Sequence, residues 1–184
     1  MKVIFADDDA AMRERMVSAA EGLKSEFGVL DVCGVAEDGE RLIQLVEENA
    51  PVDMIISDMR MPNMDGLSAM VYLLAKYKAM HVILLTSESI VGSDEGDDTA
   101  ENEEKYAMLN QIALRLINKE TAPDKINSML EGCEKLGLST KTVAKHFGAR
   151  GFVRKPFSAK KLTVIMKQLK AKTPFIEIDI ITRG

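Results

Sequence analysis

Acidic residues follow two apolar runs in the first third of the chain. Asp58 follows the run Val52–Ile56 after one intervening serine, and Asp7 and Asp8 come directly after Lys2–Ala6. Both runs have the continuous apolar character of strands that are buried on both faces of a sheet. Ligands of parallel α/β sheets bind beyond the carboxyl ends of the strands, so Asp58 is placed for chemistry. The plainer interpretation is that Asp58 only begins a turn.

The acids after the first run form a continuous row, Asp7, Asp8 and Asp9. Neighbouring carboxylates raise one another's pKa, and a bound cation is the usual way to offset their repulsion. The row therefore predicts a cation site at a strand end.

These residues need a scaffold, and the sequence predicts one of alternating strands and helices. The expected strands are Lys2–Ala6, Val29–Ala36, the run ending at Asp58, Val82–Leu85 and Gly151–Arg154. Asp9, Asp65 and Ser158 are expected to cap the helices that follow them. In the last helix, Leu162, Ile165, Met166 and Leu169 are expected to face inward and Lys160, Lys161, Lys167 and Lys170 outward. This alternation predicts an α/β fold, a doubly wound parallel five-stranded sheet flanked by helices.

The strand ends bring further polar residues to the same rim, because parallel strands end on one edge. The fourth strand ends in Thr86 and the fifth in Lys155. Together with the acids, this set resembles the receiver domain of two-component response regulators, and the loop R-M-P-N-M-D-G at 60–66 resembles single-domain chemotaxis receivers. The resemblance covers residues 1 to about 91 and about 139 to 170, and it implies the strand order 2-1-3-4-5.

The resemblance implies a chemistry for each residue. Asp58 would be a carboxylate nucleophile that takes a phosphoryl group from a phosphohistidine. Asp7, Asp8, Asp58 and the backbone carbonyl of Arg60 would hold Mg²⁺. Lys155 would bring a second positive charge and the Thr86 hydroxyl a hydrogen bond to the phosphoryl oxygens. Taken alone, a lysine such as Lys155 is more often a solvated surface residue.

The resemblance also implies a switch. Thr86 would move toward the new phosphoryl group, and the ring of Phe152 would turn inward. Arg60 and Glu88 hold positions that tune dephosphorylation in the family, and the Lys155–Pro156 peptide bond would be cis. Phe152 taken alone is more often a plain core residue.

The chain departs from the family between Thr86 and Lys155, an interval longer than the roughly 20 to 25 residues that a loop, a helix and a loop need. An insertion at about 92–137 is expected to hold an acidic solvated loop, 92–104, and a helical hairpin. Its acids do not match a calcium loop. The apolar stripes of the hairpin are Tyr106, Leu109, Ile112, Ala113, Leu116 and Ile117, then Ile126, Met129, Leu130, Cys133 and Leu136, with a start signal at Thr121–Asp124.

Two further segments allow two interpretations each. Residues 138–147 resemble the recognition helix of a helix-turn-helix module, but they run directly into the fifth strand, which favours packing on the sheet over entry into a DNA groove. The receiver domain is expected to span 1–172. In the extension that follows, 173–184, apolar and acidic residues alternate, which is typical of a strand. It could lie parallel beside the fifth strand or pair with a second copy of the chain, making a homodimer, for which the face of the last helix is another candidate.

Composition narrows the function. The chain has 184 residues, 46% of them hydrophobic, a formal charge of −5 and two cysteines without metal-site spacing. These features favour a cytoplasmic protein that spans no membrane and argue against general nucleic-acid binding. We expect a signalling switch rather than an enzyme, one that exchanges phosphoryl groups with a sensor histidine kinase or phosphotransfer protein, uses Mg²⁺ and acts on a downstream protein, with chemotaxis as one setting. The alternatives are a DNA-binding transcriptional regulator that uses the insertion, and a pseudo-receiver that binds partners without phosphorylation.

Overall fold

The computed structural model describes residues 1–23, 30–77, 79–87, 100–118, 122–135 and 137–179. The strands are β1 (Lys2–Ala6), β2 (Asp31–Ala36), β3 (Met54–Asp58), β4 (His81–Thr86), β5 (Gly151–Arg154) and β6 (Ile176–Ile178). The helices are α1 (Ala10–Gly22), α3 (Gly39–Asn49), α4 (Gly66–Lys76), α5 (Ala100–Ile117), the 3-10 turn η1 (Pro123–Lys125), α6 (Ile126–Lys135), α7 (Thr140–His146) and α8 (Ala159–Lys170). None of the helices in these ranges is long and apolar enough to cross a membrane.

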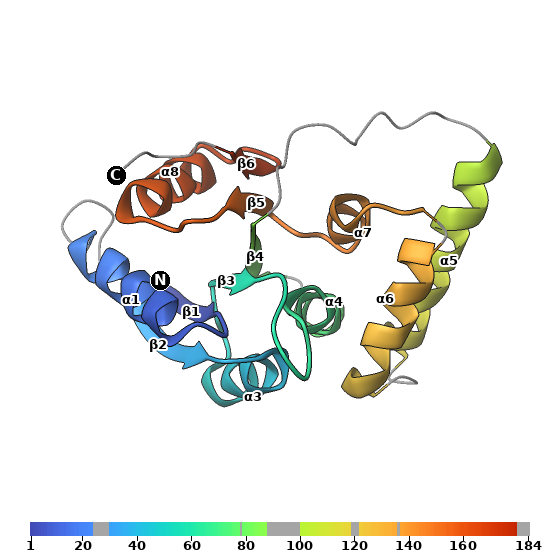
Figure 1. Cartoon of the computed structure of the whole chain (residues 1–184), viewed down its shortest axis with the longest axis horizontal. Coiled ribbons are helices and arrows are strands. Elements are labelled where there is room, and N and C mark those ends of the chain that lie inside the picture. The colour runs from blue at the N-terminus through green and yellow to red at the C-terminus, as the bar shows by residue number, and fades with distance from the viewer. Residues whose placement is uncertain (24–29, 78, 88–99, 119–121, 136, 180–184) are drawn as a thin grey trace.

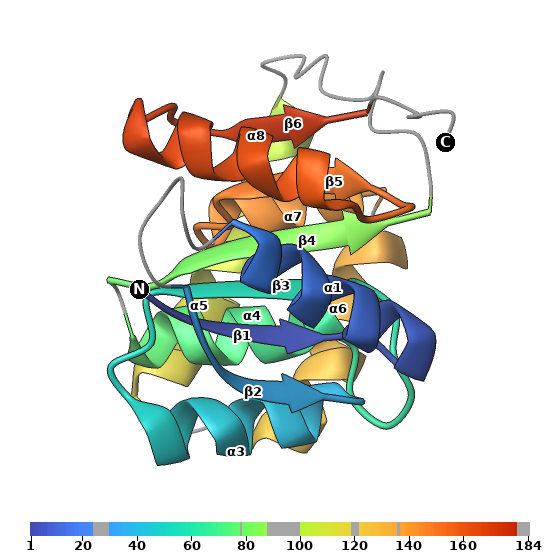
Figure 2. The same cartoon turned by 90° about the vertical axis from the view of Figure 1, so that its left-hand side faces the viewer.

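The strands form one parallel sheet in the order β2-β1-β3-β4-β5-β6. The order expected for five strands is confirmed, and β6 extends the sheet beside β5. In Figure 2 the strands are stacked in this order and their arrowheads point the same way, so their carboxyl ends share one edge. Asp58 is the last residue of β3 and Thr86 the last of β4, and both therefore lie at that edge.

Side chains at the helix starts explain where the helices begin. The carboxylate of Asp9 accepts a hydrogen bond from Ala11 N–H, and that of Asp65 accepts one from Ser68 N–H. Ser158 caps α8 in the same way. These three predicted caps are confirmed, and Asp38 caps the start of α3 in the same way.

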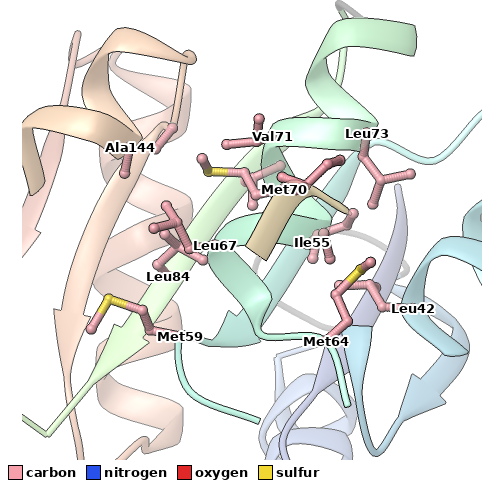
Figure 3. Packing of buried hydrophobic residues seen from close by; sticks show 14 of the residues in the cluster. Leu42, Ile55, Met59, Met64, Leu67, Met70, Val71, Leu73, Leu84 and Ala144 are labelled. Carbon is pink, nitrogen blue, oxygen red and sulfur yellow. The ribbon is translucent and has the colours of Figure 1, made fainter. Parts of the chain in front are cut away.

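Helices cover both faces of the sheet. Helices α1 and α8 pack on one face, and α3, α4 and α7 pack on the other (Figure 1). Figure 3 shows the second face, where Leu67 and Met70 of α4 lie close to Leu84 of β4. Both faces of the central strands are thus apolar and buried, which is why the strands read as continuous hydrophobic runs.

The inserted helices α5 and α6 lie on the outer side of α4, away from the sheet (Figure 1). In α5 the predicted stripe is buried at Leu109, Ile112 and Leu116. Tyr106 differs, because its side chain is 42% exposed and its ring packs on His146. The prediction of an acidic loop at 92–104 is partly wrong, because residues 100–104 belong to α5. Residues 92–99 lie outside the described part of the chain.

The second inserted helix agrees with its predicted stripe. Ile126, Leu130 and Cys133 of α6 are buried and Met129 is partly buried, while Thr121 and Leu136 lie outside the described residues. The segment that follows forms α7, whose Val143 and Ala144 are buried in the same core as the sheet. Packing on the sheet, expected for 138–147, is confirmed.

The tail pairs within the chain, since β6 runs parallel to β5 with Phe152 opposite Glu177. Ile176 and Ile178 are buried on the α8 side, and Glu177 pairs with Lys141 at 3.0 Å on the α7 side. Gly151 makes this pairing possible, because a Cβ there would lie 2.2 Å from the carbonyl oxygen of Ile176. Ile180 lies outside the described residues.

One expectation for α8 is wrong. Lys160, Lys167 and Lys170 are exposed as predicted, but the side chain of Lys161 is only 2% exposed. The helix turns this residue toward the chain segment between β5 and α8, where its ammonium meets backbone carbonyls.

Candidate functional site

Three carboxylates meet at the carboxyl edge of the sheet. Asp58 ends β3 and is 6% exposed, and Asp7 directly follows β1 and is fully buried. Asp8 follows Asp7 and is exposed to solvent. One oxygen from each of the three side chains lies within 4.8 Å of the others. The predicted convergence of these acids is therefore confirmed.

Lys155 joins this cluster from the other end of the chain. Its ammonium donates a hydrogen bond of 2.7 Å to Asp58 Oδ2 and lies 2.8 Å from Asp7 Oδ2. Its backbone N–H donates to the carbonyl of Thr86 at 2.7 Å, which ties the end of β5 to the end of β4. The Lys155–Pro156 peptide bond is cis, as the resemblance implies. Lys155 is thus a partly buried cation paired with two acids, and the interpretation as a solvated surface lysine is wrong.

The ionisation of the pair reflects burial and charge together. Burial raises the pKa of Asp58, and the negative charge of Asp7 raises it further. The hydrogen bond and charge of Lys155 lower this pKa, but by less, so the net shift is upward. Burial alone would lower the pKa of Lys155, but its bonds and charge interactions with Asp58 and Asp7 raise it. The ammonium therefore stays charged at neutral pH, next to carboxylates that repel each other.

The backbone around Asp58 is held by close packing. The hydroxyl of Ser57 donates to the carbonyl of Asp58 at 2.8 Å. Gly66 at the start of α4 approaches the same carbonyl so closely that a Cβ would lie 1.9 Å from its oxygen. Gly66 N–H also donates to the carbonyl of Met59, which closes the loop after β3. These contacts fix the backbone position from which the Asp58 side chain extends.

Arg60 lies two residues beyond Asp58 and turns its side chain toward the insertion. Its guanidinium lies 3.2 Å from Glu134 of α6 and 3.8 Å from Asp65. Its backbone N–H donates a long hydrogen bond of 3.4 Å to Asp58 Oδ1. The inserted helix therefore contacts the loop that follows Asp58.

The two expected switch residues lie on neighbouring strands. Thr86 ends β4, is 5% exposed and stands opposite Arg154 in the pairing of β4 with β5. Phe152 of β5 is 3% exposed, and its ring centroid is 6.1 Å from that of Phe175, just before β6. Phe152 is thus a core residue covered by the C-terminal extension. Glu88 lies outside the described residues.

The donor set of the acidic cluster fits a hard divalent cation. Three carboxylates can each offer an oxygen, and oxygen ligands are those that Mg²⁺ prefers. Mg²⁺ keeps several waters, and the exposure of Asp8 leaves the cluster open to solvent on that side.

Sequence reasoning missed two cations that hold the backbone of the site. Arg13 of α1 donates to the carbonyls of Asp7 and Asp8 at 2.7 and 3.1 Å. Lys161 of α8 donates to the carbonyls of Arg154 and Pro156 at 2.5 and 3.0 Å. Arg13 lies one turn inside α1, a spacing from which its side chain can reach back to the residues just before the helix. Nothing in the spacing of Lys161 separates it from its exposed neighbours.

A sequence model of the response regulator receiver domain matches residues 3–131. The chain belongs to this family. The matched part of the receiver domain contains Asp7, Asp8, Asp58 and Thr86, while Lys155 lies beyond it.

Known proteins agree with this assignment. Over 125 residues the chain is 32% identical to protein-glutamate methylesterase/protein-glutamine glutaminase 5 of Myxococcus xanthus, covering 66% of this chain and 31% of that protein. The chain thus spans about a third of that relative's length.

Solved structures share the fold. The isolated REC domain of RcsB from Salmonella enterica serovar Typhimurium, determined with the phosphomimetic BeF3−, has a TM-score of 0.55 at 18% identity, covering 100% of this chain and 96% of that one. Vibrio cholerae chemotaxis protein CheY4 has a TM-score of 0.55 at 21% identity, covering 91% of this chain and 96% of that one.

Proposed function

We propose that this receiver domain is a phosphorylation-controlled switch of a two-component system that accepts a phosphoryl group on Asp58. The observation that carries the proposal is the position of Lys155, whose ammonium lies 2.7 Å from Asp58 and 2.8 Å from Asp7. A carboxylate that attacks an anionic phosphoryl group needs compensating positive charge at that point. The donor would be a sensor histidine kinase or a phosphotransfer protein.

The transfer follows from the residues present. A carboxylate oxygen of Asp58 forms a bond to phosphorus while the bond from phosphorus to the donor's imidazole nitrogen breaks, and that nitrogen keeps the electron pair. Lys155 moves from the carboxylates to the phosphoryl oxygens, and the Thr86 hydroxyl donates to them. Mg²⁺, held by Asp7, Asp8, Asp58 and the carbonyl of Arg60, would neutralise charge on the phosphoryl oxygens.

The output would be a change in the surface near β5. Phosphorylation adds a charge of about −1.5 to −2 at Asp58, which draws Thr86 toward it and lets Phe152 repack. A downstream protein would bind this altered face. We propose no catalytic activity other than the domain's own phosphorylation and dephosphorylation of Asp58. Chemotaxis enters the proposal as one setting, through the resemblance of the loop at 60–66 to single-domain chemotaxis receivers.

Intact mass spectrometry tests the proposal. The chain is incubated with acetyl phosphate and Mg²⁺, beside Asp58→Asn and a sample with EDTA. One phosphoryl adduct on the wild type, absent from the variant and from the EDTA sample, is the expected result. A folded wild-type chain that takes no adduct from acetyl phosphate or from a histidine kinase would be a pseudo-receiver, and the proposal would fail.

The DNA-binding alternative has less support. Val143 and Ala144 of α7 are buried in the core, and Lys141 and Lys145 of the same helix pair with Glu177 of β6. A helix held in this way does not present its residues to a groove. Binding to random duplex that weakens steeply with salt would favour this alternative over the switch.

A further inference from the structure

Lys161 is a buried lysine close to the proposed phosphorylation site. Its side chain is 2% exposed, whereas Lys160, the residue before it on α8, is exposed. Lysine is almost never fully buried unless it is paired, because removing an ammonium from water costs several kcal/mol. A lysine at this position therefore calls for a role that an apolar side chain could not fill.

The acceptors of Lys161 lie on both sides of Lys155. The ammonium donates to the carbonyl of Arg154, the residue before Lys155, and to that of Pro156, the residue after it. The N–H of Lys155 itself donates to the carbonyl of Thr86. Three hydrogen bonds from two neighbouring elements thus fix the backbone from which the Lys155 side chain extends.

Fixing this backbone matters because the lysine side chain is long and flexible. Four methylene groups separate its ammonium from the backbone, so a small shift of the backbone displaces the charge from Asp58 and Asp7. A misplacement of about 1 Å can lower a rate by as much as about 100-fold.

The C-terminal extension supports the same segment. Arg154 lies 3.3 Å from Asp179, which follows β6. Burial lowers the pKa of Lys161, and the negative charge of Asp179 opposes this. Asp179 thus faces both cations of the segment, and its charge partly offsets the effect of burial on the pKa of Lys161.

We infer that Lys161 is a positioning residue for phosphoryl transfer, which holds the backbone on both sides of Lys155 so that the Lys155 ammonium meets the phosphoryl oxygens. The inference rests on the proposed function of Asp58. It assigns Lys161 no contact with the phosphoryl group, since its ammonium is directed at backbone carbonyls.

A double-mutant cycle tests this role. Lys161→Met removes the ammonium and keeps the length of the side chain, and Lys160→Met is the matched control on the exposed face. The phosphorylation rate with acetyl phosphate and Mg²⁺ is expected to fall about tenfold in Lys161→Met and to stay unchanged in Lys160→Met. In the Lys155→Met background, Lys161→Met is expected to cause no further loss, because the group it positions is gone.

A loss of equal size in both backgrounds would mean that Lys161 acts only on general stability, and no loss would mean that it does not act at all. Either result would overturn the inference. If Lys161→Met does not fold, the same cycle is run with Lys161→Gln, whose shorter amide cannot reach both carbonyls.

Amide hydrogen exchange separates this inference from the proposed function. The N–H of Lys155, bonded to Thr86, should exchange at least about tenfold faster in Lys161→Met than in the wild type or Lys160→Met. A wild type without a phosphoryl adduct refutes the proposed function, whereas unchanged protection of the Lys155 N–H refutes the role of Lys161.

Discussion

The ammonium of Lys155 lies 2.7 Å from Oδ2 of Asp58, although 97 positions separate the two residues in the sequence. Asp58 ends β3 and Lys155 directly follows β5, and β4 lies between these strands. The contact exists because all strands are parallel and end at one edge of the sheet. It places a cation beside a buried carboxylate that also lies close to Asp7 and Asp8.

The first prediction concerns this cation. Lys155→Met should lower the rate of phosphorylation by acetyl phosphate by about 10²- to 10³-fold, the usual effect of removing one group that stabilises developing negative charge. Stopped reactions analysed by intact mass give the rate, and circular dichroism checks the fold. Lys160→Met serves as the control. A Lys155→Met rate within twofold of the wild-type rate would rule out the proposed role.

The second prediction concerns the stability cost of ionised Asp58. Because burial raises its pKa in the folded state, folding is penalised above that pKa, where the carboxylate is charged in both states. The penalty fades as the pH falls from the raised pKa of the folded state to the ordinary value of about 3.9 in the unfolded state. Below that value Asp58 is neutral in both states.

Asp58→Asn removes this penalty. Without divalent cations at pH 7, the variant should melt higher than the wild type, by about 2–4 °C per kcal/mol gained. The difference should almost disappear near about pH 3.5, just below the ordinary pKa of about 3.9. Melting followed by circular dichroism measures it, and the exposed Asp31→Asn is the control. A variant that melts lower than the wild type at pH 7 would contradict the prediction.

The third prediction concerns Mg²⁺. A cation that binds only the folded state at 100 times its Kd raises the free energy of unfolding by about 2.7 kcal/mol. Asp8→Asn removes one oxygen anion from the cluster and should weaken binding on the order of tenfold. Titration calorimetry measures the Kd, with Asp31→Asn as the control. Equal affinity in all three proteins would place the cation elsewhere.

Local signals made the scaffold predictable. Strands buried on both faces read as apolar runs, so the end of each run located Asp7, Asp58 and Thr86 on one edge. Asp9 and Asp65 were recognisable as caps because each directly precedes a helical pattern. Strand runs and helix caps depend on residues that are neighbours in the sequence, so the sequence alone is enough to predict them.

The features that were missed depend on the tertiary structure. Lys161 has the helical position of a solvent-facing residue, and only the carbonyls of Arg154 and Pro156 make its site polar. Tyr106 belongs to an apolar stripe, but it is 42% exposed and its ring packs on His146 of α7. Neither environment is encoded by spacing along one helix.

The fourth prediction concerns Gly66. Gly66→Ala would place a methyl group 1.9 Å from the carbonyl oxygen of Asp58, so the end of β3 or the start of α4 must move. We expect a loss of about 1–3 kcal/mol in the free energy of unfolding and slower phosphorylation of Asp58. Urea denaturation measures the stability.

A matched control for this variant lies at the end of α1. A Cβ at Gly22 meets nothing within 4 Å, so Gly22→Ala should be neutral or stabilise the protein by up to about 1 kcal/mol. Equal stability of the two variants would show that the contact between Gly66 and Asp58 tolerates a methyl group.

The fifth prediction concerns the contact between the insertion and the loop that follows Asp58. Arg60 pairs with Glu134 of α6, and the side-chain amide of Asn127 donates to the carbonyl of Asn63. The ion pair is half exposed, so its contribution to stability should stay below about 1 kcal/mol. Its effect on phosphorylation is larger, because Glu134 neutralises the cation nearest to Asp58 in sequence.

Glu134→Gln keeps the shape of α6 and removes the nearer of the two carboxylates beside Arg60, while Asp65 at 3.8 Å stays in place. The rate with acetyl phosphate, an anion, should rise about two- to fivefold at low salt and return toward the wild-type rate at about 1 M salt, where screening acts over about 3 Å. Glu131→Gln, an exposed glutamate on the same helix, controls for the change in net charge. An equal rise in both variants would assign the effect to net charge, and no rise would separate the insertion from the chemistry at Asp58.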